Sequence, residues 1–207
     1  MSLFEGDPRQ RLEAGEALIQ AVPPEWLGGF FEPGGWLGFM NNPVTNKQGR
    51  HYEYAYPRVS VGDNNMEKLI ALTRILGGGV SRLRYFKRNE INNVWTLSQS
   101  GLAVCLAEHM QQYAPSRQET ILAFLNWENA ESAEERLEIA QAAKEEDRVF
   151  LNVEDYLPLV RIPEFLAGVL DNRGAVVTRK KHYNESFYDT SALEVNSQNY
   201  SLLQALQ

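Results

Sequence analysis

Residues 26–35 have the sequence WLGGFFEPGG, and residues 165–174 have the sequence FLAGVLDNRG. Both stretches follow a Pro-Glu pair. They share an aromatic residue, Leu, a small residue, Gly, two apolar residues, an acid and a final Gly. The two copies lie 139 residues apart along the chain. A repeat at this spacing predicts two related half-domains.

Each copy has the features of a helix that packs closely on another helix. Proline suits the first helical turn, where its missing N–H is not needed, and the glutamate after it favours the positive end of the helix dipole. Glycine inside a helix costs about 1 kcal/mol relative to alanine, so a packing advantage has to offset this cost. Small residues let two helix backbones approach each other. We therefore expect the repeated helices to pack on each other through Gly28, Gly29, Ala167 and Gly168.

Strands and further helices are expected after each copy. Apolar residues follow the repeated helices directly, at 36–39 and 175–178, and predict strands. A second strand, 52–61, carries alternating tyrosines that lie on one face. Asn65 can cap a helix that ends at the three glycines 77–79. The first half then continues with a hairpin over 82–97 and helices over 102–113, 117–127 and 133–146.

The second half repeats the beginning of the first half and then stops. At an offset of 134 residues, Leu193 and Val195 match Val59 and Val61, and Asn199, Leu203 and Leu206 match Asn65, Leu69 and Leu72. We therefore expect an N-terminal helical extension (1–22), a first repeat (23–147), a connector (148–162) and a partial second repeat (163–207).

Charge is distributed unevenly along the chain. The net charge is −7, which by itself argues against a nucleic-acid ligand. Residues 41–104, however, carry nine lysines and arginines against four acids, whereas residues 105–172 carry five against fourteen. Because binding depends on the local field, the basic segment keeps nucleic acid among the expected partners.

Cysteine content and hydropathy limit the possible compartments. The single cysteine, Cys105, lies in an apolar run and is expected to be a buried thiol. No apolar run approaches the length of about 20 residues that spans a bilayer, and the N-terminus lacks a signal-peptide pattern. We expect no membrane partner and a location in the cytoplasm or an organellar matrix, not secretion.

The order helix, strand, strand, helix, strand, strand, helices, opened by a Leu-small-Gly-apolar-apolar-acid motif, resembles the LAGLIDADG homing endonucleases from about Glu25 onward. The resemblance implies an α+β fold with αββαββα repeats, packed motif helices and curved antiparallel sheets. In that family the concave faces of the sheets lie in the DNA major groove. The family's activity is phosphodiester hydrolysis assisted by divalent metal, which the last acid of each motif binds.

This sequence departs from the family at the catalytic positions, which are Gly34 and Arg173. The acids that remain, Glu32 and Asp171, lie two residues earlier in each motif. Two residues correspond to about 200° of rotation around a helix, so these acids cannot replace the missing ones. We expect no catalytic residue, no metal site and no cofactor in this chain.

What the resemblance leaves is a nucleic-acid surface on the predicted strands. DNA or structured RNA is the expected ligand, because strand side chains in a groove can contact phosphates and base edges together. The candidate binding residues are Tyr54, Tyr56, Arg58, Arg82, Arg84, Lys87 and Arg88 in the first half and Arg179, Lys180 and Lys181 in the second.

Two other functions stay open at this point. The first is that the chain is a homing endonuclease subunit, which uses Mg²⁺ once a second protein chain, or self-association, completes the partial second repeat. Alternatively, it is a structural or assembly subunit whose former DNA surface contacts protein; the acidic segment 105–172 favours this hypothesis.

Overall fold

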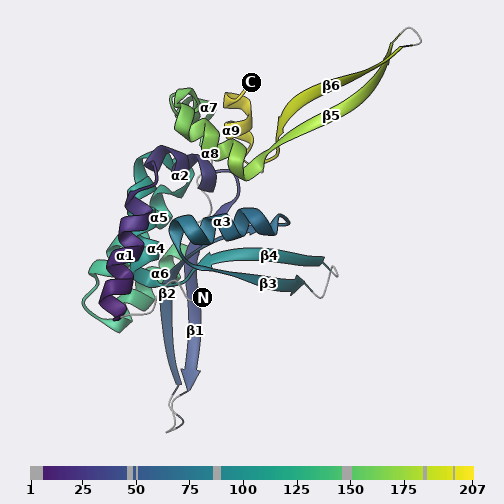
Figure 1. Cartoon of the computed structure of the whole chain (residues 1–207). Coiled ribbons are helices and arrows are strands. Elements are labelled where there is room, and N and C mark those ends of the chain that lie inside the picture. The colour runs from purple at the N-terminus through teal and green to yellow at the C-terminus, as the bar shows by residue number, and fades with distance from the viewer. Residues whose placement is uncertain are drawn as a thin grey trace.

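The computed structural model describes residues 7–45, 49, 51–85, 90–145, 151–183, 186–197 and 199–207, excluding the side chains of 44–45, 51–52, 83–85, 90–92, 144–145, 179–183 and 186–190. Figure 1 shows the arrangement of its helices and strands. The helices are α1 (Pro8–Gln20), α2 (Pro24–Phe31), α3 (Met66–Leu76), α4 (Ser100–Met110), α5 (Gln118–Asn129), α6 (Ala133–Glu145), α7 (Val153–Tyr156), α8 (Pro163–Arg173) and α9 (Tyr200–Ala205). The strands are β1 (Gly35–Thr45), β2 (His51–Asp63), β3 (Gly79–Tyr85), β4 (Glu90–Leu97), β5 (Gly174–Tyr183) and β6 (Ser186–Val195).

The first half of the chain forms a four-stranded antiparallel sheet in the order β1-β2-β4-β3. Side chains alternate between the two faces of each strand. One face contributes Leu37, Val59 and Trp95 to the main core, where they meet apolar residues of α3, α4 and α5. The mixed α+β fold inferred from the sequence is confirmed.

Helix α3 is bounded as the sequence predicts. The side chain of Asn65 accepts hydrogen bonds from the backbone N–H groups of Glu67 and Lys68, which caps the first turn. The helix ends before Gly77 and Gly78, whose φ angles of 75° and 77° are favourable for glycine. The Gly77 carbonyl then accepts a hydrogen bond from Trp95 Nε1 at 2.8 Å, which fixes the start of the β3–β4 hairpin against the core.

Two details differ from expectation. Cys105 is only partly buried on α4, whereas its neighbours Val104 and Leu106 are buried. The segment between the halves contains α7, which carries an Asn152–Asp155 capping box and the fully buried Tyr156. It therefore packs as part of the molecule and does not merely connect.

The second half begins with a hairpin whose register repeats that of β1–β2. Gly174 pairs with Val195 as Gly35 pairs with Val61, and the rows continue in step along both hairpins. In the described part of the chain β5 and β6 form a sheet of two strands, which extends away from the helices (Figure 1). The repeat predicted from the sequence is therefore visible in the strand pairing.

A second, smaller core lies behind α8. Tyr156, Phe165, Val169 and Leu202 are its buried residues. Asn199 caps α9 by accepting a hydrogen bond from the Leu202 N–H, as expected from its match to Asn65. The buried residue of α9 is however Leu202, because the helix packs on α7 and the small core. Leu203, which the sequence matches to the buried Leu69, is half-buried.

None of the helices within the described ranges is both long enough and apolar enough to span a bilayer.

Candidate nucleic-acid interface

The motif helices α2 and α8 pack side by side, with their backbones in close contact (Figure 1). A Cβ atom on Gly29 would overlap the carbonyl of Phe165, and one on Gly168 would overlap the carbonyl of Trp26. Trp26 and Phe165 are equivalent residues of the two repeats, so the two contacts are related as if by a twofold axis. Glycine is required at both crossing points because no side chain fits between the backbones.

The other small residues of the motifs lie elsewhere. Gly28 faces the backbone of Tyr113, in the short 3-10 turn after α4, and a Cβ atom there would overlap its carbonyl. Ala167 is exposed on α8. The first motif helix is therefore enclosed by backbone on two sides, by α8 and by residue 113.

Gly34 and Arg173 are direct neighbours at the ends of the motif helices. A Cβ atom on Gly34 would overlap the guanidinium group of Arg173. The arginine side chain therefore occupies the space that a side chain at residue 34 would need. The two positions at which the resemblance predicts acids hold one guanidinium group between them.

The residual acid Glu32 is buried and fully engaged. Its carboxylate accepts hydrogen bonds from Ser116 N at 2.8 Å, from Ser116 Oγ at 2.5 Å and from the Tyr156 hydroxyl at 3.2 Å. Burial raises the pKa of Glu32 above its ordinary value, against the opposing effect of these hydrogen bonds and of Arg117. Burial and the neighbouring Glu32 also raise the pKa of the Tyr156 hydroxyl. Glu32 thus joins α2 to α7 and to the turn before α5.

The second residual acid, Asp171, has a different environment. Its Oδ2 atom accepts a hydrogen bond from Trp26 Nε1 at 2.8 Å. This contact crosses the pair of motif helices close to the crossing at Gly168. Asp171 therefore fixes the orientation of α8 on α2, and it does not lie beside Glu32 as a paired carboxylate.

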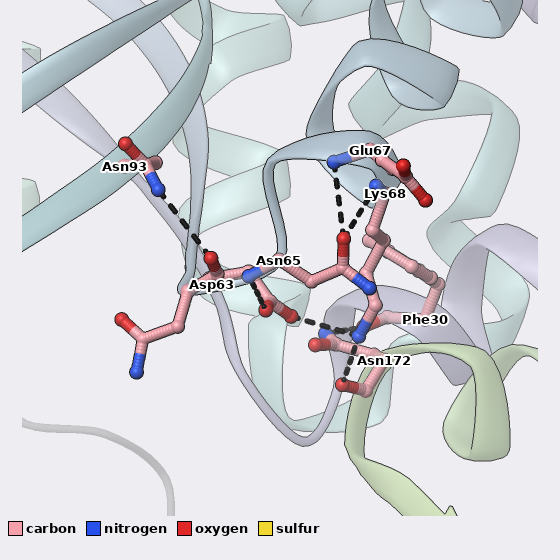
Figure 2. A network of polar contacts seen from close by, with 8 residues as sticks. Phe30, Asp63, Asn65, Glu67, Lys68, Asn93 and Asn172 are labelled. Atoms are coloured by element: carbon pink, nitrogen blue, oxygen red, sulfur yellow. Dashed lines mark hydrogen bonds and ion pairs between the residues drawn. The ribbon is translucent and has the colours of Figure 1, made fainter.

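A polar network joins the end of α8 to the first turn of α3 (Figure 2). Lys68 Nζ forms an ion pair with Asp63 Oδ2 at 2.7 Å and donates to the Asn172 carbonyl at 2.9 Å. The Asn172 amide donates to the carbonyl of Phe30 on α2. Burial alone would raise the pKa of Asp63, but the hydrogen bonds from Lys68 and Asn65 and the charges of Lys68 and Arg173 hold it below its ordinary value. The charge of Arg173 therefore stabilises the ionised form of Asp63 in this network.

The residues at the motif ends do not fit a divalent metal. Mg²⁺ requires oxygen ligands with free lone pairs in near-octahedral geometry. Glycine at 34 offers no side-chain ligand, the Glu32 oxygens already accept three hydrogen bonds, and Arg173 places a positive charge at the centre. Within the part of the chain that the structure describes, no three His, Cys, Asp or Glu side chains form a cluster that could hold a metal.

The sheet face opposite the core presents aromatic and polar side chains. Trp36 is 38% exposed and Tyr54 is 45% exposed, on neighbouring strands. The rings of Tyr54 and Tyr56 are 5.9 Å apart, and Asn42 donates a hydrogen bond to the Tyr54 hydroxyl at 2.8 Å. Arg58 lies on the same face in the next row and donates to Thr96 Oγ1 at 3.1 Å. We call this set the open face: Trp36, Asn42, Tyr54, Tyr56, Arg58 and Thr96.

The register separates Arg82 from the open face. Arg82 pairs with Asn93, two residues after the pair of Val80 and Trp95, and alternation places it on the side of Trp95. It is exposed, beyond the helices that cover this side. The predicted cluster is thus divided between two faces of the sheet.

For four of the other predicted basic residues the structure describes only the backbone, and two more lie outside the described residues. Arg84, on β3, pairs with Ile91 of β4. Arg179 and Lys181 lie on β5 in the rows equivalent to Met40 and Asn42 of β1. Lys180 is the partner of Asp189. The side chains of these four residues are outside the described set, as are Lys87 and Arg88 entirely.

Several residues of this region were missed from the sequence. Trp36 and Asn42 could have been found, because Leu37 and Phe39 alternate with them along β1. Ser116 and Tyr156, in contrast, reach Glu32 across 84 and 124 residues of chain, and no local pattern indicates that contact.

Comparison with known proteins addresses the fold. No protein-family model matches the sequence, and no curated protein matches it. Among solved structures, the chain is similar to the meganuclease I-SmaMI bound to uncleaveable DNA, at 14% identity over 88% of this chain and 70% of that chain, with a TM-score of 0.58. The chain has the fold of the LAGLIDADG homing endonucleases.

Two further LAGLIDADG structures support the same conclusion. I-CpaMI bound to uncleaved DNA matches at 14% identity over 90% of this chain and 72% of that chain, with a TM-score of 0.54. I-GzeII in complex with its DNA target matches at 14% identity over 84% and 66%, with a TM-score of 0.52. At this identity the likeness establishes the LAGLIDADG fold, and function has to be argued from the residues themselves.

Proposed function

We propose that this protein binds nucleic acid, DNA or structured RNA, through its sheets and does not cleave it. The observation that carries the proposal is the pair formed by Gly34 and Arg173. One guanidinium group fills the place where the LAGLIDADG resemblance predicts two metal-binding acids. A fixed positive charge there favours a phosphate and disfavours a metal ion.

The open face supplies the contacts that such binding needs. Tyr54 and Trp36 present aromatic surface, and Arg58 and Asn42 present hydrogen-bond donors on the same side of the sheet. Aromatic side chains stack on exposed bases, and donors on strands contact phosphates or base edges. The solved LAGLIDADG structures with which the chain shares its fold were determined with DNA, which favours duplex DNA as the first ligand to test.

Binding is tested by fluorescence anisotropy with a random duplex and a structured RNA over a series of salt concentrations. We expect binding at about 50 mM salt that weakens linearly on a log–log plot, because phosphate contacts release counterions. Arg58→Gln and Tyr54→Ala should weaken binding, whereas Arg11→Gln, an equal charge change on the exposed side of α1, should not. An absence of binding at about 50 mM salt would refute the proposal.

Cleavage is tested separately with supercoiled plasmid and Mg²⁺. We expect no nicking by the chain alone, since Glu32 and Asp171 are engaged in hydrogen bonds within the protein. Nicking that Glu32→Gln or Asp171→Asn abolishes, with the fold intact by circular dichroism, would favour the endonuclease alternative.

A second protein chain is the other candidate partner, and one observation favours it. Val176 and Leu193 are 75% and 59% exposed on the β5–β6 hairpin, whereas the equivalent Leu37 and Val59 of the first half are 6% and 0% exposed. Apolar residues in these rows are covered by helices in one half only. A second copy of the chain, or another protein, would bury them.

This partner is tested by sedimentation velocity on the isolated protein and by co-purification. Self-association that Val176→Thr and Leu193→Thr reverse would identify a second copy. A stoichiometric protein partner, with a 260/280 nm absorbance ratio free of nucleic acid, would favour the assembly-subunit function. A monomer with no partner in either experiment would exclude this candidate.

A further inference from the structure

A cavity of about 450 Å³ lies at the junction between the two halves of the molecule. Its walls are the end of α2, the end of α8 and the segment between β6 and α9. The residues that line it include Arg117 and Arg173, together with Ser197 and Asn196. Arg117 Nη2 already donates to the Gly35 carbonyl at 2.8 Å. A lining with this many hydrogen-bond donors suits an anion.

The acid in this lining, Glu32, is buried and held by neighbouring hydroxyl and backbone groups. Glu32 accepts its hydrogen bonds from Ser116 and Tyr156, on the side of the cavity near α7. Its burial also favours the protonated, neutral form. Arg173 Nε has no hydrogen-bond partner among the described residues, so Glu32 does not accept from that atom.

Arg173 is the donor with capacity left. Its Nε atom is buried and has no hydrogen-bond acceptor among the described residues. Arg173 lies in the last turn of α8, where the helix dipole favours a positive charge. The dipole does not explain why the side chain extends into the space left by Gly34. A buried donor without an acceptor is costly, so a bound ligand that accepts from it would stabilise the site.

The position of Arg173 on the molecule indicates which anion this is. β1 begins at Gly35, directly after Gly34, and β5 begins at Gly174, directly after Arg173. The two hairpins therefore diverge from this point (Figure 1). A nucleic acid that lies across both hairpins passes the junction, and its backbone offers phosphates there.

We propose that Arg173 binds a phosphate group at the mouth of this cavity, and that this group is a backbone phosphate of nucleic acid that lies across both hairpins. The identity of the macromolecule rests on the proposed function, whereas the phosphate site rests on the cavity and on Arg173.

The first test compares Arg173→Gln with Arg11→Gln in duplex binding across a salt series. Each phosphate contact on duplex DNA contributes about 0.9 to the slope of log affinity against log salt, which at about 0.1 M salt corresponds to an affinity change of about eightfold. We expect Arg173→Gln to lose about this much in slope and affinity. Arg173→Lys should keep the slope and lose less affinity, while Arg11→Gln should match the wild type.

The second test does not depend on nucleic acid or on a folded variant. Pyrophosphate is titrated into the wild-type protein, and the Nε–H resonances of the arginines are followed by NMR, with acetate at equal ionic strength as the control. We expect a saturable shift of the Arg173 resonance with pyrophosphate alone.

The outcomes separate this inference from the proposed function. Wild-type duplex binding that Arg173→Gln leaves unchanged in affinity and slope overturns the inference and leaves the proposed function standing. A saturable pyrophosphate shift in a protein that binds no nucleic acid refutes the proposed function, supports the phosphate site and assigns it to a small phosphate ligand. An Arg173 resonance unmoved by pyrophosphate, in a protein that binds no duplex, overturns both.

Discussion

The conformation of Arg173 depends on the absence of a side chain at residue 34. The guanidinium group lies where a Cβ atom on Gly34 would be, so the two residues constrain each other although they are 139 positions apart in sequence. The φ angle of Gly34 is not in the left-handed region, and its backbone would accept alanine. The nearest obstacle to a side chain at residue 34 is therefore the arginine.

This interdependence predicts a coupling that a double-mutant cycle can measure. Gly34→Ala should reduce the free energy of unfolding by about 1 kcal/mol in the wild type, since Arg173 must move, and by close to zero in an Arg173→Ala background. Urea denaturation of the four proteins gives the coupling energy. Equal effects of Gly34→Ala in both backgrounds would contradict the described contact.

A second prediction at this scale concerns the pH dependence of stability at Glu32. Its pKa in the folded protein is above the ordinary value of 4.5 because of burial, so the folded state holds the proton more tightly than the unfolded chain does. The stability from this group is complete below about pH 4.5 and is lost as the pH rises through the raised pKa. Unfolding free energies of the wild type should therefore fall over this range more steeply than those of Glu32→Gln.

The control for this experiment is Glu13→Gln, an acid on the exposed side of α1. Its pH profile should follow the wild type. If Glu32→Gln and the wild type give parallel profiles in urea denaturation from pH 4 to pH 8, Glu32 is not a buried, perturbed acid.

At the scale of elements, the contact between α2 and α8 determines how the two halves are joined. The crossing depends on two backbone contacts, at Gly29 and at Gly168, with the Trp26–Asp171 hydrogen bond beside them. Proteins tolerate glycine inside helices where it permits this kind of approach, although its intrinsic helix propensity is low. The stability of the pair is therefore sensitive to any added atom at the crossing.

Gly29→Ala should lower the free energy of unfolding by about 2–3 kcal/mol, because the new methyl group overlaps the opposing backbone and overpacked cores lose about this much. Gly101→Ala is the matched control on α4, where the nearest neighbour of a Cβ atom is the flexible end of Leu12 at 3.0 Å. The control should be neutral or stabilising, since alanine favours a helix. Thermal unfolding that ranks the two variants in the opposite order would exclude the crossing as a tight contact.

At the scale of the whole molecule, local patterns in the sequence predicted the elements better than they predicted the contacts. The Asn65 cap, the glycines after α3 and the repeated hairpins were all predictable, because each depends on residues a few positions apart. The side of the sheet taken by Arg82 was not, because charged, aromatic and apolar residues mix along 82–88 and leave the alternation undefined. The register of β3 with β4 determines the face on which Arg82 lies.

The junction cavity was beyond local prediction for the same reason. Its lining comes from five separate parts of the chain, and the degenerate motif indicated only that acids were missing at residues 34 and 173. That the arginine fills the vacant space, and that Ser116 and Tyr156 hold Glu32, follows from packing over long sequence separations.

The two hairpins that share one register differ in how much of the protein has to open to expose their amides. The β1–β2 pair belongs to a four-stranded sheet over the main core, whereas β5–β6 is a pair of strands with exposed Val176 and Leu193. A lone hairpin is marginally stable in water. Its amides should therefore exchange with deuterium through local opening, orders of magnitude faster than those of β2 near Val59, which should wait for global unfolding. A ligand or partner on β5–β6 would be detected first as a slowing of that exchange.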